Sequence, residues 1–151
     1  MLDSYIEIGD IQLQMGAQTL AHAAYQRALA QYRKIVENWP RDAHARTQAA
    51  AAYGQLAYLK LQFRRPREAV DSASQGLSLA PNQGWIAVNL VEAYVFSGQL
   101  AKAQEIFLKY RAVKIGEVSF KQALITDIQQ LSDTGLNHPD VPNLRNWLAK
   151  N

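Results

Sequence analysis

The sequence predicts an all-helical protein built from a series of helical hairpins. Apolar residues recur at helical spacing along most of the chain, as at Tyr25, Ala28, Leu29 and Tyr32. Hydrophobic residues make up 48% of the chain, and alanine supplies much of that fraction, which suits closely packed helices. Runs of β-branched residues are few, so strand signals are sparse.

An internal repeat supports the same fold class. Three pairs of residues are separated by 34 positions: Tyr53 and Ala87, Leu56 and Leu90, and Ala69 and Ala103. An earlier copy contains Tyr5, Ile8 and Ala21 in the same order, but it lies 48 positions before the middle copy. The excess of 14 residues corresponds to about four helical turns. We therefore expect two neighbouring helices to be lengthened with their apolar faces kept in phase.

The pattern places six helices in the repeat region. Their expected ranges are 2–15, 18–38, 42–62, 66–79, 83–97 and 100–112. The apolar stripe of the second helix continues through Ile35, Val36 and Trp39 until Pro40 stops it, and Asp42 is expected to cap the third. Pro81 stops the fourth helix and Gly98 permits the turn after the fifth. Arg64 occupies the place of the corresponding turn glycine after the third helix.

The repeat register is lost after residues 114–116, although helical spacing continues. A seventh helix is expected around the apolar positions Val118, Ala123, Leu124, Ile128 and Leu131. Its solvent-exposed face is expected to carry Lys121, Gln122, Gln129 and Gln130. Such a helix covers the apolar side of the last repeat. A final helix is expected over 141–149, with Asp140 as its cap and Leu144, Trp147 and Leu148 pointing inward.

The clearest copy carries Pro81, Leu90, Tyr94, Gly98, Ala103 and Phe107 at concerted spacing. Residues 2–112 resemble the tetratricopeptide repeat family, in the bacterial type with one extended helix pair. The resemblance implies a right-handed superhelical array of three repeats, at about 2–40, 41–81 and 82–115. Residues 116–151 would form C-terminal capping helices, and the whole chain would be one structural domain. The segment from Phe120 to Asp140 resembles the closing segment of bacterial multidomain proteins of this family.

The resemblance also implies where a partner binds, because the first helix of each pair lines the concave surface of such arrays. The expected groove residues are Glu7, Asp10, Gln14, Gln55, Tyr58, Gln62, Trp85, Asn89, Glu92 and Phe96. This lining suits a peptide or helix held by amide hydrogen bonds, with Trp85 and Phe96 as apolar anchors.

One subclass of the family is expected to differ from this chain. Domains that grip the acidic carboxylate end of chaperones use a cluster of lysine, arginine and asparagine residues. The corresponding positions here hold Ile6, Asp10, Gln55, Trp85 and Asn89, of which only Asn89 fits. The acidic residues of the groove would repel such a tail, so we expect no binding of it.

No catalytic constellation is found, and we expect the chain not to be an enzyme. The histidines His22, His44 and His138 do not converge at any spacing that chemistry requires, and cysteine is absent. The run from His138 to Asp140 is better interpreted as a loop turn and helix cap. No metal-binding motif and no glycine-rich phosphate loop is present, so no cofactor or metal is expected.

Three functional hypotheses follow. The first is a protein–protein interaction module whose peptide partner the residues do not identify. The second is a regulatory or scaffolding role within a larger protein, with an upstream domain of the same chain as the partner. The third is weak nucleic-acid binding by the basic cluster Arg64, Arg65 and Arg67, which the small net charge of +3 disfavours.

The sequence also predicts the location and the assembly of the protein. No apolar run is long enough to span a bilayer and no signal peptide is recognisable, so we expect a cytoplasmic protein without membrane contact. We expect Leu2, Ile6 and Leu13 on the first helix to remain uncovered by any preceding repeat, which would allow either a monomer or a weak dimer.

Overall fold

The computed structural model describes residues 3–151, which form eight helices and one two-stranded ribbon. The repeat region contains α1 (Asp3–Gln14), α2 (Gln18–Asn38), α3 (Ala43–Gln62), α4 (Pro66–Leu79), α5 (Gly84–Phe96) and α6 (Leu100–Tyr110). The C-terminal part contains β1 (Lys114–Ile115), β2 (Val118–Ser119), α7 (Phe120–Asp133) and α8 (Asp140–Lys150). The expected all-helical class and the positions of its helices are confirmed; Leu2 lies outside the described residues.

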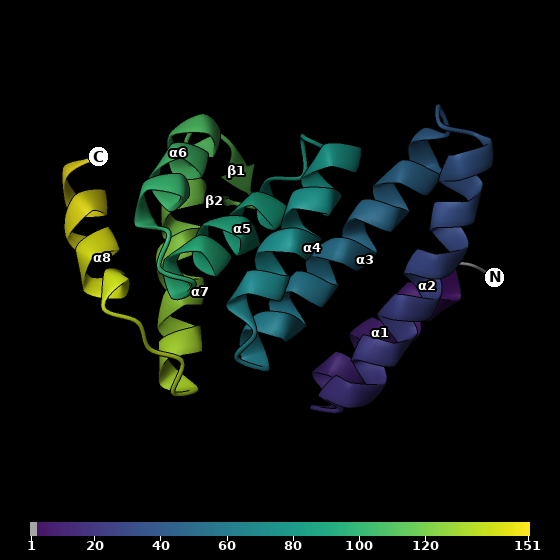
Figure 1. Ribbon diagram of the computed structural model, residues 1–151, viewed down its shortest axis with the longest axis horizontal. Coiled ribbons are helices and arrows are strands. Elements are labelled where there is room, and N and C mark those ends of the chain that lie inside the picture. The colour runs from purple at the N-terminus through teal and green to yellow at the C-terminus, as the bar shows by residue number, and fades with distance from the viewer. Residues whose placement is uncertain (1–2) are drawn as a thin grey trace.

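The helices follow one another along the longest axis of the molecule, from α1 and α2 at one end to α8 at the other (Figure 1). Each helix of the repeat region packs against the next, and α5 additionally contacts α3 and α7. The two lengthened helices are α2, with 21 residues, and α3, with 20 residues. They account for the extra length between the first two copies of the repeat, as the spacing predicts.

The turns inside the helix pairs repeat the same backbone conformation. Gly16, Arg64 and Gly98 each have positive φ, at 75°, 60° and 78°. At each turn, the backbone amide of this residue donates a hydrogen bond to the carbonyl oxygen three residues before it. The amide of the next residue donates a hydrogen bond to the carbonyl oxygen five residues before that residue. Arg64 therefore adopts the left-handed conformation that glycine takes without steric cost at the other two turns.

The buried residues form successive clusters instead of one centre. The first two clusters join α2 to α3, around Tyr32 and Ala49 in one case and Tyr25 and Leu59 in the other. The third and largest extends from α3 to α8. This distribution explains why a regular apolar period along the sequence was informative, since each helix buries its stripe against its own neighbours.

Aromatic residues close the C-terminal end of the structure. Phe107 of α6 contacts Phe120 of α7 and Trp147 of α8 edge-on, with ring centroids 5.9 Å and 5.4 Å apart. Leu144 and Leu148 are fully buried beside them. The inward face expected for the final helix is confirmed, and α7 and α8 together cover the apolar side of α5 and α6.

Three local expectations need correction. Residues 114–119 form a β-hairpin that sparse strand signals did not predict. Asp42 caps α3 through a 2.9 Å bond from the Ala45 amide, as expected, but Asp140 is the first residue of α8 and makes no cap bond. Trp39 is 65% exposed because the backbone leaves the helical conformation at this residue, which turns its side chain out of the apolar stripe.

Candidate functional site

A pocket of about 210 Å³ opens where α3, α5 and α7 meet. Its lining comes from four elements: Gln55 and Tyr58 of α3, Trp85, Val88 and Asn89 of α5, Ile115 of β1, and Asp127 of α7. Four of the expected groove residues, Gln55, Tyr58, Trp85 and Asn89, are thus brought together. No lysine or arginine of the described residues lines this pocket. Its lining combines polar side chains with aromatic and aliphatic ones.

The wall formed by α5 is held close to α3 at Gly54. The Asn89 side-chain amide donates to the Gly54 carbonyl over 3.1 Å, in a fully buried bond. A Cβ atom on Gly54 would lie 2.4 Å from the six-membered ring of Trp85, so only glycine leaves room for the indole. The Trp85 Nε1 group donates to Gln83 over 3.2 Å. Asn89 and Trp85 are therefore positioned by structural contacts, and Trp85 remains half-buried at the pocket.

Glu92 lies on α5 one turn beyond the pocket-lining residues Val88 and Asn89, and it does not line the pocket itself. Val88 and Asn89 follow Trp85 by three and four residues, and Glu92 follows these two by four and three, which places all of them on one side of the helix. The Glu92 side chain is fully buried, and neither carboxyl oxygen has a hydrogen-bond partner in the part of the chain that the structure describes. The expectation that Glu92 presents an exposed carboxylate to a partner is therefore corrected.

Burial dominates the electrostatics of this region. It raises the pKa of Glu92 well above its ordinary value of 4.5, and the negative charge of Asp127 raises that pKa further. Burial also raises the pKa of the Asp127 carboxyl. The pKa of Tyr58 is raised by burial and by the charges of both carboxyl groups. Burial is thus the first cause of all three raised pKa values, and neighbouring negative charge adds to it at Glu92 and Tyr58.

The remaining expected residues extend away from this pocket toward α1. Asp10 accepts a 2.6 Å bond from the Tyr25 hydroxyl and a 3.4 Å bond from the Gln55 amide, so it links α1 to α2 and α3. Gln62 accepts a hydrogen bond from Gln18. Glu7 and Gln14 are exposed on α1. These residues do not converge with Trp85 and Asn89 on one pocket, although Gln55 touches both groups.

Phe96 lies at a different place from the one expected. Its side chain is only 5% exposed, and it lines a pocket of about 360 Å³ beside the turns after α3 and α5. The expectation of Phe96 as an exposed groove anchor is corrected, because it sits at the C-terminal end of α5 where helix packing encloses it. The same pocket is lined by Arg64, Arg65, Arg67 and His138.

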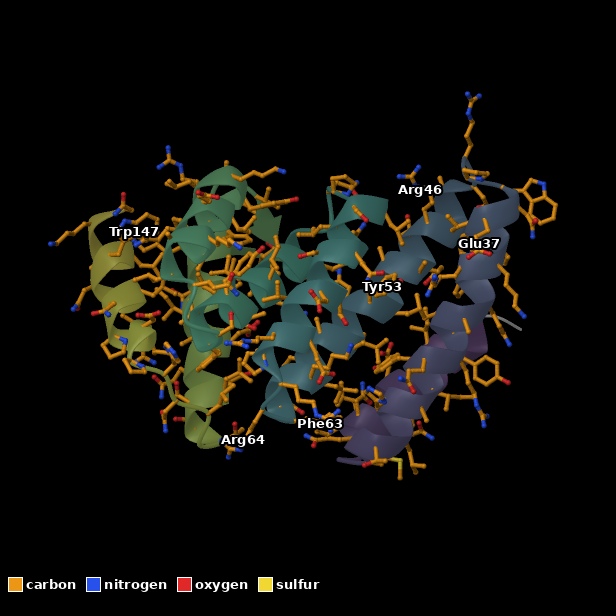
Figure 2. The ribbon with its side chains drawn as sticks, in the orientation of Figure 1. Glu37, Arg46, Tyr53, Phe63, Arg64 and Trp147 are labelled. Carbon is orange, nitrogen blue, oxygen red and sulfur yellow. The ribbon has the colours of Figure 1, made fainter. Side chains whose placement is uncertain are left out.

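The basic cluster is largely engaged within the protein. Arg64 donates to the Gly135 carbonyl over 2.9 Å and to the Thr134 carbonyl over 3.4 Å, which ties the turn after α3 to the turn after α7. Figure 2 shows Arg64 at this junction. Arg65 lies 3.9 Å from Glu68 in an exposed pair. One arginine of the cluster thus stabilises a turn, and another is partly neutralised.

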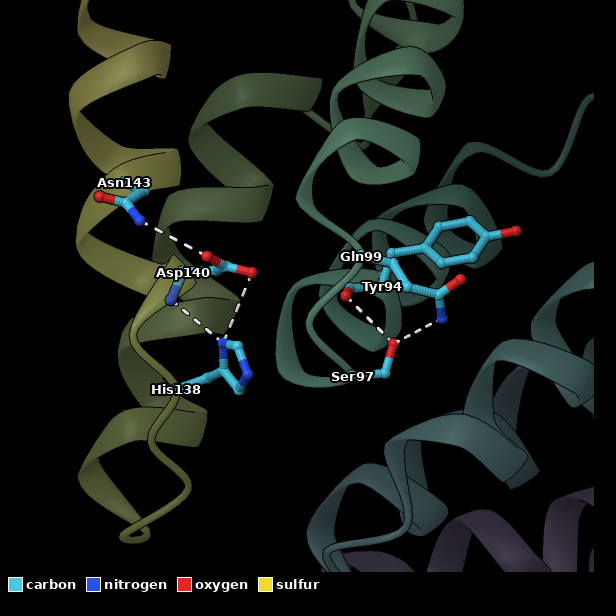
Figure 3. A network of polar contacts seen from close by, with 6 residues as sticks. All are labelled: Tyr94, Ser97, Gln99, His138, Asp140 and Asn143. Carbon is cyan, nitrogen blue, oxygen red and sulfur yellow. Dashed lines mark hydrogen bonds and ion pairs between the residues drawn. The ribbon is translucent and has the colours of Figure 1, made fainter.

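His138 performs the capping role that was expected of Asp140. Its Nδ1 atom accepts the Asp140 amide over 3.1 Å and lies 3.7 Å from the Asp140 carboxylate (Figure 3). The imidazole also packs against the turn at Gly98. Its Nε2 atom lies 3.4 Å from the position that a Cβ atom would occupy if Gly98 were replaced by a larger residue. Figure 3 shows the neighbouring bonds of Ser97 with Tyr94 and Gln99 on that turn. The geometry is that of a helix start held against a neighbouring turn.

Asp127, Val88 and Ile115 complete the pocket but were absent from the expected groove. One signal for Asp127 was available, because it is an acidic residue between Leu124 and Ile128 on the otherwise apolar side of α7. Ile115 could not have been found in this way, since its position depends on the unexpected hairpin.

Comparison of the sequence with models of protein families and with curated proteins finds no match. In residues 3–151, none of the helices combines the length and the apolar character that crossing a bilayer requires. Within the same range, histidine and acidic residues form no group of three that could hold a metal ion.

Proposed function

We propose that this chain is a non-catalytic protein-interaction domain of the tetratricopeptide type, which binds an extended peptide or helix along α1, α3, α5 and α7. The observation that carries the proposal is the pocket shared by α3, α5 and α7, where polar and aromatic side chains from separate helices converge. Concave sites with a few convergent polar groups are the usual places where ligands bind.

The repeated turn geometry supports the family assignment within this proposal. Gly16, Arg64 and Gly98 share one backbone conformation and lie at the spacing of the sequence repeat. Helix pairs joined in the same way present corresponding faces, and the first helices of the pairs then line one continuous surface. Gln55, which bonds to Asp10 of α1 and lines the pocket with α5, lies in the middle of that surface.

A selection of displayed random peptides tests the proposal. Peptides that bind the chain are expected to bind at least about tenfold more weakly to a variant with Gln55→Ala and Trp85→Ala, since these side chains contribute to the pocket and aromatic contacts dominate binding energy. A matched control replaces Gln26 and Trp39, which lie outside the pocket, with alanine. Failure to select any peptide, or equal weakening by both variants, would contradict the proposal.

A second candidate function is a regulatory or scaffolding role within a larger protein, in which α1 packs against an upstream domain of the same chain; pairing of two copies through α1 is the competing use of the same surface. Exposed apolar side chains on α1, in the turn after it and at the start of α2 favour it: Ile8 is 41% exposed, Ile11 56%, Met15 78% and Leu20 58%. Such side chains at one end of a helical stack are suited to contact with a further layer. The mass of the protein in solution, measured by light scattering with and without Ile11→Glu, distinguishes pairing of copies from a free end.

A further inference from the structure

A groove runs between α2 and α4, and α3, which packs against both helices, forms its floor. It consists of two cavities of about 400 Å³ and 190 Å³, which are joined because Arg33, Tyr53 and Gln75 line both of them. Figure 2 shows Tyr53 on α3 between the ribbons of α2 and α4. Among the described residues, this α2–α4 groove shares none of its lining with the pocket between α3, α5 and α7. It is a separate surface of the protein.

The α2–α4 groove has the length of a short helix. Its lining extends over residues 26–37 of α2, 49–60 of α3 and 68–79 of α4. Each range covers about three helical turns, or about 16 Å at a rise of about 1.5 Å per residue. The larger cavity contains the earlier parts of α2 and α4 and the smaller one the later parts, so these two walls run in the same direction. The groove can therefore hold about three turns of one further helix.

The lining offers incompletely covered apolar surface and one unused hydroxyl group. Leu29, Val36 and Leu79 are only partly buried, although they pack against a core cluster. Tyr53 is 7% exposed, and its hydroxyl has no hydrogen-bond partner within residues 3–151. Tyrosine hydroxyls at such depth usually have a partner, so this group is available to a ligand in the groove.

The charges along the α2–α4 groove are mainly negative. Glu37, Glu68 and Asp71 line it, against Arg33 and Lys60. Lys60 already donates a hydrogen bond to α4 over 2.7 Å. Asp71 is exposed and forms no ion pair in the part of the chain that the structure describes. Because Glu68 and Asp71 both lie on α4, a complementary ligand carries basic side chains on the flank that faces α4.

The polar groups of the groove favour a helix over an extended segment as the ligand. An extended backbone needs hydrogen-bond partners along its length, whereas a helix satisfies its own amide and carbonyl groups. The two serines of the α4 wall are already engaged, since Ser72 accepts from Lys60 and Ser78 donates to the Gln75 carbonyl. Amphipathic helices that bind in apolar grooves use anchors at intervals of three and four residues.

We propose that the α2–α4 groove binds an amphipathic helix of another protein. The apolar stripe of that helix lies on Tyr53 and Leu56, and its basic flank faces Glu68 and Asp71. This interaction surface goes beyond the proposed function and does not depend on it, because the two sites have different lining residues.

Three fluorescein-labelled peptides of about 15 residues test the proposal, with binding to the full chain measured by fluorescence anisotropy. All carry leucine at every third or fourth position. The first has lysine along one flank of this stripe, the second has glutamate there, and the third is the lysine peptide with a central proline, which breaks the helix. The lysine peptide is expected to bind saturably, and each of the other two at least about threefold more weakly.

Two variants locate the site of binding. Ala30 is exposed on α2 and lines the larger cavity, so Ala30→Trp fills the groove and is expected to weaken the lysine peptide by about tenfold or more. Ala101→Trp, at an exposed position of α6, is the matched control and is expected to leave the affinity unchanged. Asp71→Lys is expected to lower the preference for the lysine peptide over the glutamate peptide by about threefold or more. Circular dichroism verifies the fold of each variant.

Several results would overturn the proposal. They are no saturable binding of the lysine peptide, equal binding of the proline peptide, or equal affinities of the wild type and Ala30→Trp. A wild type that forms dimers in light scattering, with Ala30→Trp monomeric, would instead show that a second copy occupies the groove.

The same variants separate this inference from the proposed function. Displayed peptides weakened only by the variant with Gln55→Ala and Trp85→Ala bind the pocket between α3, α5 and α7. Those weakened only by Ala30→Trp bind the α2–α4 groove. Either site can therefore fail its test while the other one passes.

Discussion

Replacing Glu92 with glutamine should change how the stability of the protein depends on pH. Glu92 is fully buried, and burial together with the charge of Asp127 raises the pKa of its carboxyl well above 4.5. The unfolded chain, in which this group is solvated, loses the proton near pH 4.5, whereas the folded protein retains it to higher pH. Glutamine has nearly the same shape and does not titrate, so the substitution removes this difference between the two states.

The sign and size of the effect follow from proton linkage. Between pH 4.5 and the higher pKa of the folded state, the unfolded chain binds fewer protons, so the free energy of unfolding falls as pH rises. The slope for one group is about 1.4 kcal/mol per pH unit. The contribution of Glu92 is therefore fully present below pH 4.5 and is lost as pH rises through its folded-state pKa. The free energy of unfolding of Glu92→Gln, relative to that of the wild type, should therefore rise by about 1.4 kcal/mol per pH unit between pH 4.5 and the folded-state pKa of Glu92.

Urea denaturation followed by far-ultraviolet circular dichroism provides the measurement, at pH 5, 6 and 7 and constant ionic strength. The quantity of interest is the difference in unfolding free energy between wild type and variant at each pH, because other titrating groups cancel from it. Glu105→Gln on the exposed side of α6 serves as the control. A difference that stays constant from pH 5 to pH 7 would refute the assignment of Glu92 as a carboxyl whose ionisation is opposed by burial.

Three further substitutions test local features of the fold by the same denaturation assay. Gly54→Ala should destabilise the protein by about 1–3 kcal/mol and alter the fluorescence of Trp85, since a Cβ atom would overlap the indole; unchanged fluorescence and stability would contradict this packing. Arg64→Gly should be more stable than Arg64→Ala by about 1 kcal/mol, because both lose the guanidinium but only glycine adopts φ of 60° without strain, and the reverse order would exclude that strain. Asp42→Ala should cost about 1 kcal/mol through loss of the bond to the Ala45 amide, whereas Asp42→Asn should cost less; equal losses would show that the cap bond is unimportant.

Local pattern predicted the helices well because each of them buries its apolar stripe against adjacent helices. The period that relates Leu56 to Leu90, and the longer interval before it, correctly predicted where α2 and α3 would be extended. Prolines and a capping aspartate marked helix boundaries through interactions that span only a few residues. The same reasoning failed for Trp39, where the helix ends and the phase of the stripe no longer applies.

The candidate site was predicted only in part. Helical phase correctly directed Gln55, Tyr58, Trp85 and Asn89 toward one region, and these side chains do line one pocket. Helical phase gives the direction of a side chain, however, and does not specify how deeply it is buried. Glu92 lies on the same stripe and is fully buried, on a helix that α3, α7 and α8 all contact.

Helix positions, turn conformations and the apolar faces of this protein are encoded in its amino-acid pattern, since they depend on residues within a few turns of one another. The composition of the pocket is not encoded in that way. Asp127 reaches it from α7, and its neighbours Tyr58 and Trp85 come from α3 and α5. Which polar groups meet, and whether water still reaches them, depends on the distances and angles at which separate helices pack, and these arise only when the whole chain is folded.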